Sequence, residues 1–228
     1  GWEFDLRVDL IKKQDMTLDF GFNIATNKGK VKKLDGVIKE LYIPYYYEFV
    51  RLEEGGPIGE WYGYKSAGRL YQNHEEVMAL RPVNASGSQQ TYRTTYETAG
   101  DLYLMDLDGD GRVTKANDRT TLGNFNPKWF GGFQLSFNYK NLYASAVFNY
   151  SYGAKRLWYY QYDKAYNMGT YNTYDDMLDA YNFTGNTAGF PRLTMHTGSN
   201  LICDTYIHDA SYLRMSALNL NYRLPKKW

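Results

Sequence analysis

The stretch Phe133–Tyr150, FQLSFNYKNLYASAVFNY, gives the clearest indication of the fold class of this chain. Its first half, FQLSFNY, alternates apolar and polar residues, and its second half, LYASAVFNY, does so again with less contrast. Successive side chains of a β-strand point to opposite faces, so a period of two indicates strands with one apolar face. The link between the halves, Lys140–Asn141, is short enough for a β-hairpin. The stretch therefore predicts two antiparallel strands.

Three more segments repeat this alternation. WEFDLRVDLIK and MTLDFGFNIAT are separated by a few polar residues and predict a second hairpin. SYLRMSALNLNYRL predicts a fifth strand, and Pro225 follows it, as expected because proline cannot donate to a ladder. The pattern thus predicts that residues 1–228 form an all-β, antiparallel region with strands near 2–12, 16–26, 130–140, 142–152 and 211–224.

Short and long connections alternate between these strands. Both hairpin links are short, whereas residues 27–129 and 153–210 are far longer than an ordinary loop. An antiparallel sheet then has both short turns at one end and both long connections at the other. Transmembrane β-barrels have this asymmetry, with short periplasmic turns and long extracellular loops. We interpret 27–129 and 153–210 as extracellular loops, although a soluble β-sandwich also explains the alternation itself.

Strand length and aromatic content favour the barrel over the sandwich. Segments of roughly ten residues suit tilted membrane strands, and Tyr and Trp cluster near their ends, as in aromatic girdles. Aromatics make up 18% of the residues although the mean hydropathy is −0.60, so the chain needs surfaces that are both apolar and polar. The predicted strands are too few to close a membrane barrel. We expect part of a longer barrel wall, whose polar interior is faced by Glu3, Asp5, Asp9 and Asp19.

Composition excludes several other functions. A formal net charge of +1 gives no basic excess for binding nucleic acid. A single cysteine excludes an internal disulfide, and the three histidines have no metal-ligand spacing. The sequence has no G-x-S-x-G, H-E-x-x-H or Walker motif, and no carboxylate pair with distinctive spacing. We therefore predict no catalytic residue and no enzymatic activity.

An acidic, glycine-containing stretch, DLDGDGRVTKAND, spans residues 106–118 and resembles the sequence of a calcium-binding loop. Alternate carboxylates converge on one point where a cation offsets their repulsion. The twelfth position holds Asn117 in place of a bidentate Glu, and no flanking helix is predicted, so a calcium sensor is disfavoured. We predict a structural Ca²⁺ site, with a metal-free turn as the alternative. The candidate ligands are Asp106, Asp108, Asp110, Arg112 through its carbonyl, Thr114, Asn117 and Asp118.

Two aromatic clusters in the long connections are candidate substrate contacts. Their ring faces suit the C–H faces of sugars, although packing and girdle positions are the more common roles of such residues. The candidates are Tyr45, Tyr46, Tyr47, Trp158, Tyr159 and Tyr160.

Three stretches in a fixed order resemble one family. GPIGEWYGYKSAGRLY is followed by DLDGDGRVTKANDRTTLGNFNPKWFGGFQLSFNYKNLYASAVFNYSYG and then by DASYLRMSALNLNYRLPKKW. Together they resemble the C-terminal part of the SusC/RagA-type TonB-dependent outer-membrane transporters of Bacteroidetes, over nearly the whole chain. The resemblance implies a 22-stranded barrel with an N-terminal plug, energy supplied through TonB, and a SusD-like surface lipoprotein as a lid. It also implies import of oligosaccharides or peptides across the bacterial outer membrane.

The sequence itself contains no recognisable plug or TonB-contacting segment, so we expect these parts elsewhere in a longer polypeptide. One rival hypothesis is a secreted, calcium-stabilised β-sandwich that binds glycans. Another is a glycan-degrading enzyme, which the sequence does not support because it lacks paired catalytic carboxylates.

Overall fold

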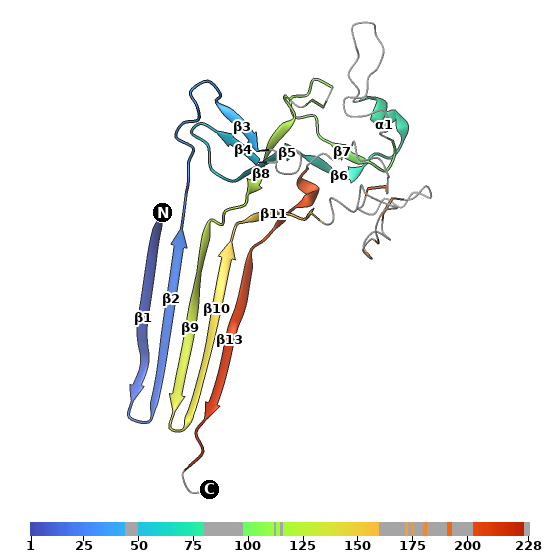
Figure 1. Cartoon of the computed structure of the whole chain (residues 1–228). Coiled ribbons are helices and arrows are strands. Elements are labelled where there is room, and N and C mark those ends of the chain that lie inside the picture. The colour runs from blue at the N-terminus through green and yellow to red at the C-terminus, as the bar shows by residue number, and fades with distance from the viewer. Residues whose placement is uncertain are drawn as a thin grey trace.

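The computed structural model describes residues 1–43, 50–79, 98–111, 113–114, 116–159, 172, 175, 180–181, 191–192 and 203–225. It contains a long β-sheet and, beyond one end of that sheet, a smaller body that we call the cap (Figure 1). The residues of the cap come from 27–128 and 153–211, which are the two long connections between strands of the long sheet.

The long sheet has five strands in the order β1-β2-β9-β10-β13, and each strand is antiparallel to its neighbours. The strands occupy the five segments whose sequences alternate. Two hairpins, β1–β2 and β9–β10, lie side by side, and the fifth strand pairs with β10 (Figure 1). The strands are β1 (Trp2–Lys13), β2 (Met16–Thr26), β9 (Trp129–Tyr139), β10 (Leu142–Tyr152) and β13 (Tyr212–Tyr222).

The register gives the long sheet one apolar face and one polar face. A row across the middle of the apolar face joins Val8, Phe20, Leu135, Ala146 and Leu218. Residues between these rows point to the opposite side of the sheet. That polar face carries Asp5, Arg7, Asp9, Asp19, Asn23, Gln134, Ser136, Ser145, Asn149, Arg214 and Asn219.

One position departs from the strict alternation that the sequence predicts for β1. The sequence places Leu10 on the apolar face after Val8, but the ladder shifts between Asp9 and Ile11, and Ile11 stands opposite Leu18. A strand with one extra residue forms a β-bulge, which takes that residue out of register. Leu10 is the extra residue, and Ile11 continues the apolar face.

Both short turns lie at the end of the sheet away from the cap (Figure 1). In the β9–β10 turn, Lys140 has φ = +51°, a left-handed conformation that tight hairpins require. Its N–H donates to the carbonyl of Asp15 at 2.9 Å, which ties the two turns together. Both long connections leave from the opposite end, so the sheet has the asymmetry that the link lengths predict.

In the described residues, the cap contains three small sheets. Strands β3 (Glu40–Ile43), β4 (Val50–Glu53), β5 (Glu60–Tyr64) and β8 (Arg119–Asn124) form a sheet in that order. The other two sheets pair β6 (Ser66–Leu70) with β7 (Leu102–Leu104), and β11 (Lys155–Leu157) with β12 (Ile207–Asp209). The described residues of the cap also include a short helix α1 (His74–Ala79) and a 3-10 turn η3 (Asp204–Tyr206).

None of the helices in the described residues is long and apolar enough to cross a membrane.

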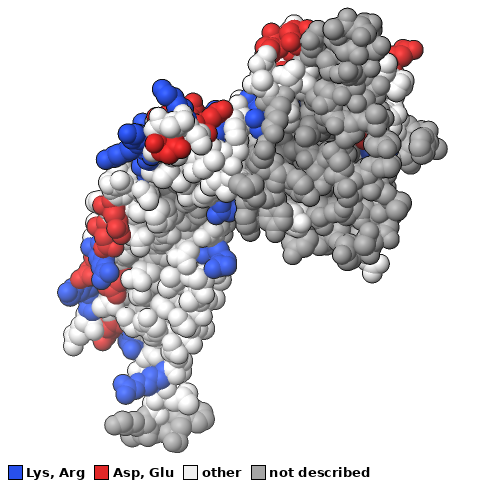
Figure 2. Space-filling view, turned by 45° about the horizontal axis from the view of Figure 1, so that its top comes forward, with Lys and Arg blue, Asp and Glu red and all other residues white. Residues whose placement is uncertain are grey.

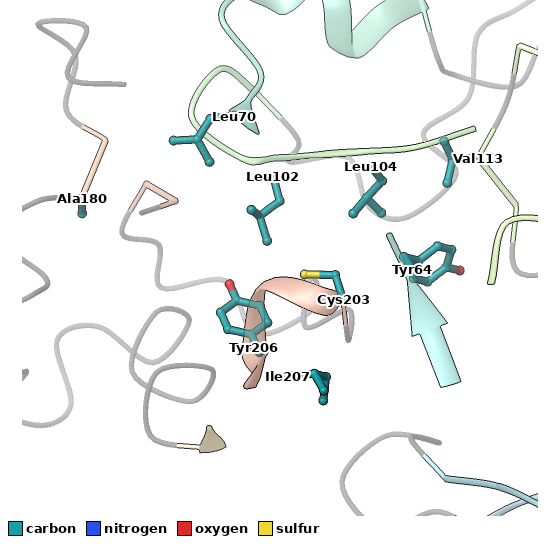
Figure 3. Packing of buried hydrophobic residues seen from close by; sticks show 9 residues of the cluster. All are labelled: Tyr64, Leu70, Leu102, Leu104, Val113, Ala180, Cys203, Tyr206 and Ile207. Carbon is teal, nitrogen blue, oxygen red and sulfur yellow. The ribbon is translucent and has the colours of Figure 1, made fainter. Parts of the chain in front are cut away.

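One hydrophobic core joins the two long connections. The first connection contributes Tyr64, Leu104 and Val113, the second contributes Cys203 and Tyr206, and all of these are buried (Figure 3). Tyr64 and Cys203 also form an isolated parallel bridge. Removal of apolar surface from water is the main term that stabilises such a cluster. Because both connections supply side chains, neither builds this core alone.

Hydrogen bonds join the two ends of the second long connection, just after β10 and just before β13. The N–H of Gly153 donates to Ser211 Oγ at 2.9 Å, and the N–H of Ser211 donates to Asp209 Oδ1 at 2.7 Å. The ammonium of Lys155 lies 3.3 Å from the same carboxylate. Hydrogen bonds from Ser211, assisted by Lys155, lower the pKa of Asp209 to about 2, so this carboxylate is charged at neutral pH.

Candidate functional site

The acidic stretch forms a tight loop on the cap. Carboxylate oxygens of Asp106, Asp108 and Asp118 all lie within 4.8 Å of one another. Asp106 accepts hydrogen bonds from the N–H groups of Gly109 and Gly111, each at 2.7 Å. Desolvation acts to raise the pKa of Asp106, but these backbone donors, above all Gly111, hold it below its ordinary value. The loop therefore favours the charged form of this carboxylate.

Asp118 is fully buried, and its carboxylate holds the loop through hydrogen bonds to two backbone N–H groups. Its Oδ1 accepts a hydrogen bond from the N–H of Leu107 at 2.7 Å, and its Oδ2 accepts one from the N–H of Thr114. Burying a charge without such partners would be costly. Val113, next to Thr114, lies in the cap core. The hydrogen bonds of Asp118 thus connect the acidic loop to the buried core of the cap.

The grouping of the predicted ligands differs from that of an EF-hand loop. Asp118, one residue after the twelfth position, joins Asp106 and Asp108, whereas Asp110 is not in the group of three. Both Gly109 (φ = +76°) and Gly111 have positive φ, which lets the chain fold its N–H groups back onto Asp106. A simple count of loop positions misses this arrangement.

The remaining predicted ligands take part in the loop's own hydrogen bonds or lie outside the described residues. Asn117 donates from Nδ2 to Asp108 Oδ2 at 2.7 Å, and its N–H donates to Thr114 Oγ1 at 3.1 Å. Arg112 lies outside the described residues. Carboxylate and hydroxyl oxygens are the hard ligands that Ca²⁺ prefers, so the donor set fits such an ion.

The cap also contains a groove, and Tyr159 is the described residue of the two aromatic clusters that lines it. Tyr45, Tyr46, Tyr47 and Tyr160 lie outside the described residues. Tyr159 lines the groove, as do Ile43 and Val50, which flank residues 44–49. Trp158 packs edge to face on His208, with ring centroids 5.2 Å apart, and does not line the groove.

The groove lies between the four-stranded sheet and β11 and has a cavity volume of about 680 Å³. That volume is in the range of small-ligand sites. The indole N–H of Trp61 donates to the carbonyl of Lys155 at 2.9 Å and so fixes β11 against the sheet. Apolar side chains dominate its lining, which includes Ile43, Leu52, Ile58, Trp61, Phe125 and Leu157.

Sequence reasoning missed this groove because its walls come from distant segments. Trp61 and Phe125 stack edge to face with centroids 6.1 Å apart, although 64 positions separate them in the chain. Gly59 permits the contact, since its φ is +91° and a Cβ there would lie 2.8 Å from the Phe125 ring. Ile43, Val50 and Leu52 are apolar residues of β3 and β4, but no pattern in the sequence indicated which surface they face.

An ion pair on β4 and β5 was also missed. Arg51 donates from Nε and Nη2 to Glu60 Oε2 at 2.9 and 2.8 Å, and Thr121 donates to Glu60 Oε1 at 2.8 Å. Desolvation acts to lower the pKa of Arg51, but hydrogen bonding to Glu60 raises it overall. The guanidinium also lies 4.2 Å from the centre of the Tyr62 ring. These contacts stiffen the sheet that carries the groove.

The apolar face of the long sheet ends in two aromatic belts. At the cap end, Trp2 and Trp129 pack edge to face with centroids 5.2 Å apart, and Tyr152 stands opposite Trp129. At the other end lie Tyr139 and Tyr222, on either side of the same β10 residue. Between the belts, the described residues on this face are mostly Leu, Phe, Val, Ile, Ala and Met, and none is charged.

No protein-family model matches the sequence. TonB-dependent receptor P3 of Formosa agariphila is 31% identical over 235 residues, which cover 100% of this chain and 22% of that protein. TonB-dependent receptor SusC of Bacteroides thetaiotaomicron is 24% identical over 231 residues, which cover 100% of this chain and 20% of that protein. The chain is a homologue of the SusC-type TonB-dependent receptors. It spans about a fifth of the length of these curated relatives.

Solved structures show the fold of this SusC-type chain in larger proteins. A structure of the RagAB peptide transporter matches with a TM-score of 0.65 at 20% identity, covering 98% of this chain and 22% of that chain. The RagAB peptide importer in the closed-closed state matches with a TM-score of 0.66 at 20% identity, covering 97% and 22%. At this identity the likeness shows the fold alone. It confirms the predicted all-β, RagA-like architecture.

Proposed function

We propose that this SusC-type chain forms part of the wall and the outward-facing cap of a nutrient importer in the bacterial outer membrane. The nutrient, an oligosaccharide or a peptide, passes through without chemical change. One observation carries the proposal. The long sheet has an apolar face with an aromatic belt at each end and no charged residue between the belts among the described residues, and both long connections leave from the same end.

The height of the apolar face supports the proposal. Trp129 and Tyr139, one in each belt, are the first and last residues of the 11-residue strand β9. Ten steps of about 3.3 Å span roughly 33 Å along the strand. A tilt of about 40° reduces this to roughly 25 Å along the membrane normal, which is the height of the apolar band in outer-membrane barrels.

Exposure of the apolar face disfavours the soluble β-sandwich. Leu6, Leu135 and Leu218 are exposed by 42%, 41% and 67% of their surface. A sandwich would cover such residues with a second sheet, but no second layer lies on this face in the described part of the chain. Figure 2 shows a largely uncharged expanse over the long sheet, with charged groups gathered along one edge and toward the cap. Lipid is the cover that fits this surface.

The two outer strands of the sheet, β1 and β13, each have an unpaired edge among the described strands. Unpaired backbone groups in hydrocarbon are costly, so a membrane sheet must close on itself. We therefore place the chain in a closed barrel of 22 strands, as the family resemblance implies. The polar face, with Asp5, Asp9 and Asp19, then lines the interior.

Partners follow from the same proposal. The cap faces the cell exterior, where a SusD-like lipoprotein would meet it, and TonB would act through a part of the protein that this chain does not supply. The relatives' name, TonB-dependent receptor, supports TonB as a partner, and the family resemblance of the sequence implies the lipoprotein. Lipids of the outer membrane contact the apolar face, and neither nucleic acid nor an enzymatic step takes part.

Import is tested by deleting the gene in its own bacterium. We expect loss of periplasmic accumulation of a labelled oligosaccharide or peptide, and restoration of uptake by a plasmid copy. The matched control is the same deletion in a strain without TonB, where uptake is already abolished and the second deletion adds nothing. Uptake that continues at the wild-type rate in the deletion strain would contradict the proposal.

The acidic loop is proposed to hold a structural Ca²⁺ ion. The donor set fits, because three carboxylates converge within 4.8 Å and are held by backbone N–H groups. When bound, the ion would offset the repulsion between these charges. Asp106 and Asp108 would hold it, with Asp118 as the buried anchor. The ion has no part in a reaction and stiffens the cap.

The calcium proposal predicts a difference between neighbouring aspartates. Replacing Asp106 and Asp108 together by Asn should weaken Ca²⁺ binding by more than about tenfold, since two charged ligands are lost. Asp110→Asn is the matched control and should leave binding nearly unchanged, because Asp110 is outside the group of three. Isothermal titration of the chelator-treated complete transporter measures both. If well-ordered protein contains no cation, the hydrogen bonds of Asp118 alone are the stiffener.

A further inference from the structure

The groove in the cap has a lining with an unusual distribution of charge. Its walls are apolar, and among the described residues that line it, Arg156 alone is charged. Arg156 is exposed, and its Nη1 donates to the carbonyl of Phe125 at 2.8 Å. The guanidinium also lies 5.9 Å from the centre of the Phe125 ring. These contacts fix the cation at the border of an apolar hollow.

Arg156 retains the capacity to bind an anion. A guanidinium has five N–H donors in a planar fork, and the hydrogen bond to Phe125 uses one nitrogen. In the described part of the chain, no carboxylate pairs with Arg156. A ligand with an anionic group next to an apolar group would therefore satisfy both parts of the site.

The lining fits a peptide better than a sugar. An oligosaccharide presents many hydroxyl groups and needs side-chain amides and carboxylates to receive them, whereas none of the described residues that line this groove carries such a group. The side-chain amides of Asn124 and Asn126 both donate hydrogen bonds to the carbonyl of Ile58, at 3.0 and 2.9 Å. A cavity of about 680 Å³ with apolar walls has room for a large aliphatic or aromatic side chain.

We propose that the groove binds the C-terminal residue of a peptide, with its apolar side chain in the hollow and its α-carboxylate on Arg156. This inference rests on the proposed import function and names the substrate class that the function leaves open. The choice of a peptide follows from charge complementarity in the groove, because a single cation beside apolar walls matches a single terminal carboxylate beside one apolar side chain.

Binding to the complete transporter in detergent tests the inference. The probes are a tetrapeptide ending in leucine, the same peptide with an amidated C-terminus, and a tetrapeptide ending in serine. We expect the amide and the serine peptide each to bind about tenfold more weakly, the order of magnitude for losing one hydrogen bond between charged groups or one apolar side chain. Fluorescence of Trp61, which lines the groove, reports binding, and Trp61→Phe should remove that signal.

Two pairs of variants separate the groove from general damage. Arg156→Gln should reduce the acid-to-amide ratio of affinities from about ten to about one, and Arg156→Lys should restore most of it because the charge remains. Ile43→Asn should weaken the leucine peptide by about tenfold. Leu41→Asn is its control, because Leu41 is exposed by 45% on the same strand and does not line the groove.

Each outcome decides the inference. Equal binding of acid and amide, or equal effects of Ile43→Asn and Leu41→Asn, would overturn it while import of peptides still stands. Binding of oligosaccharides without any of the peptides would also overturn it and leave the import function intact. The absence of uptake of any nutrient by the intact strain would remove the import function on which the inference rests.

Discussion

Leu135→Arg should prevent most of the protein from assembling in the outer membrane. Leu135 lies on the apolar face in the central strand β9, in the row with Phe20 and Ala146, roughly midway between the two belts. An Arg facing lipid at the bilayer midplane costs about 2–4 kcal/mol, which lowers the equilibrium constant for folding into the membrane by a factor of roughly 30 to 1000. The amount of heat-modifiable protein in isolated outer membranes measures the loss.

Gln134→Arg is the matched control for this change. Gln134 is the preceding residue of the same strand and is exposed on the polar face, where an Arg meets water inside the proposed barrel. It should assemble like the unaltered protein. If both variants assembled equally well, the apolar face would not contact lipid, and a protein partner would have to cover it.

Leu104→Ala should open the cap while the long sheet stays intact. Leu104 is fully buried and belongs to the core that joins the two long connections. Replacing a buried Leu by Ala costs about 2–5 kcal/mol because apolar contacts are lost and a cavity remains. That is a large part of the stability of a small domain. Limited proteolysis of the membrane-inserted transporter should therefore cut residues 27–128 and 153–211 together.

Leu107→Ala provides the comparison within the same segment. Leu107 is 40% exposed and lies outside the core, so its truncation should change proteolysis little. Cleavage confined to the first connection in the Leu104 variant would mean that the two connections are stable separately. Cleavage of both at the same rate shows that one cooperative unit contains them.

The strands of the long sheet were predictable because their information is local. Alternation in FQLSFNY fixes which side chains share a face, and the two-residue link fixes the hairpin. The bulge at Leu10 was missed because Ile11 and Leu10 are both apolar, and only the pairing of Ile11 with Leu18 shows which one continues the face. Adjacent apolar residues leave the register open.

The candidate sites were less predictable because they depend on contacts between distant residues. The acidic loop and its candidate ligand Asp118 were recognised, but the sequence did not show that Asp118, held by the N–H groups of Leu107 and Thr114, joins Asp106 and Asp108 while Asp110 does not. The aromatic residue Tyr159 was selected for its type, whereas the groove that it lines is formed with Ile43 and Trp61 from another connection. No spacing in the sequence indicates that Tyr159 lies near Ile43 and Trp61.

Local sequence patterns were enough to predict the five strands, the polarity of their two faces and the asymmetry of their connections. Side-chain alternation and link length are enough for this, because strand geometry has a fixed period of two. Three features could be seen only in the folded chain: the two long connections share one core, Asp118 and not Asp110 joins Asp106 and Asp108, and Arg156 borders an apolar groove. These features arise from packing between residues far apart in the chain, whose free energy depends on which surfaces meet.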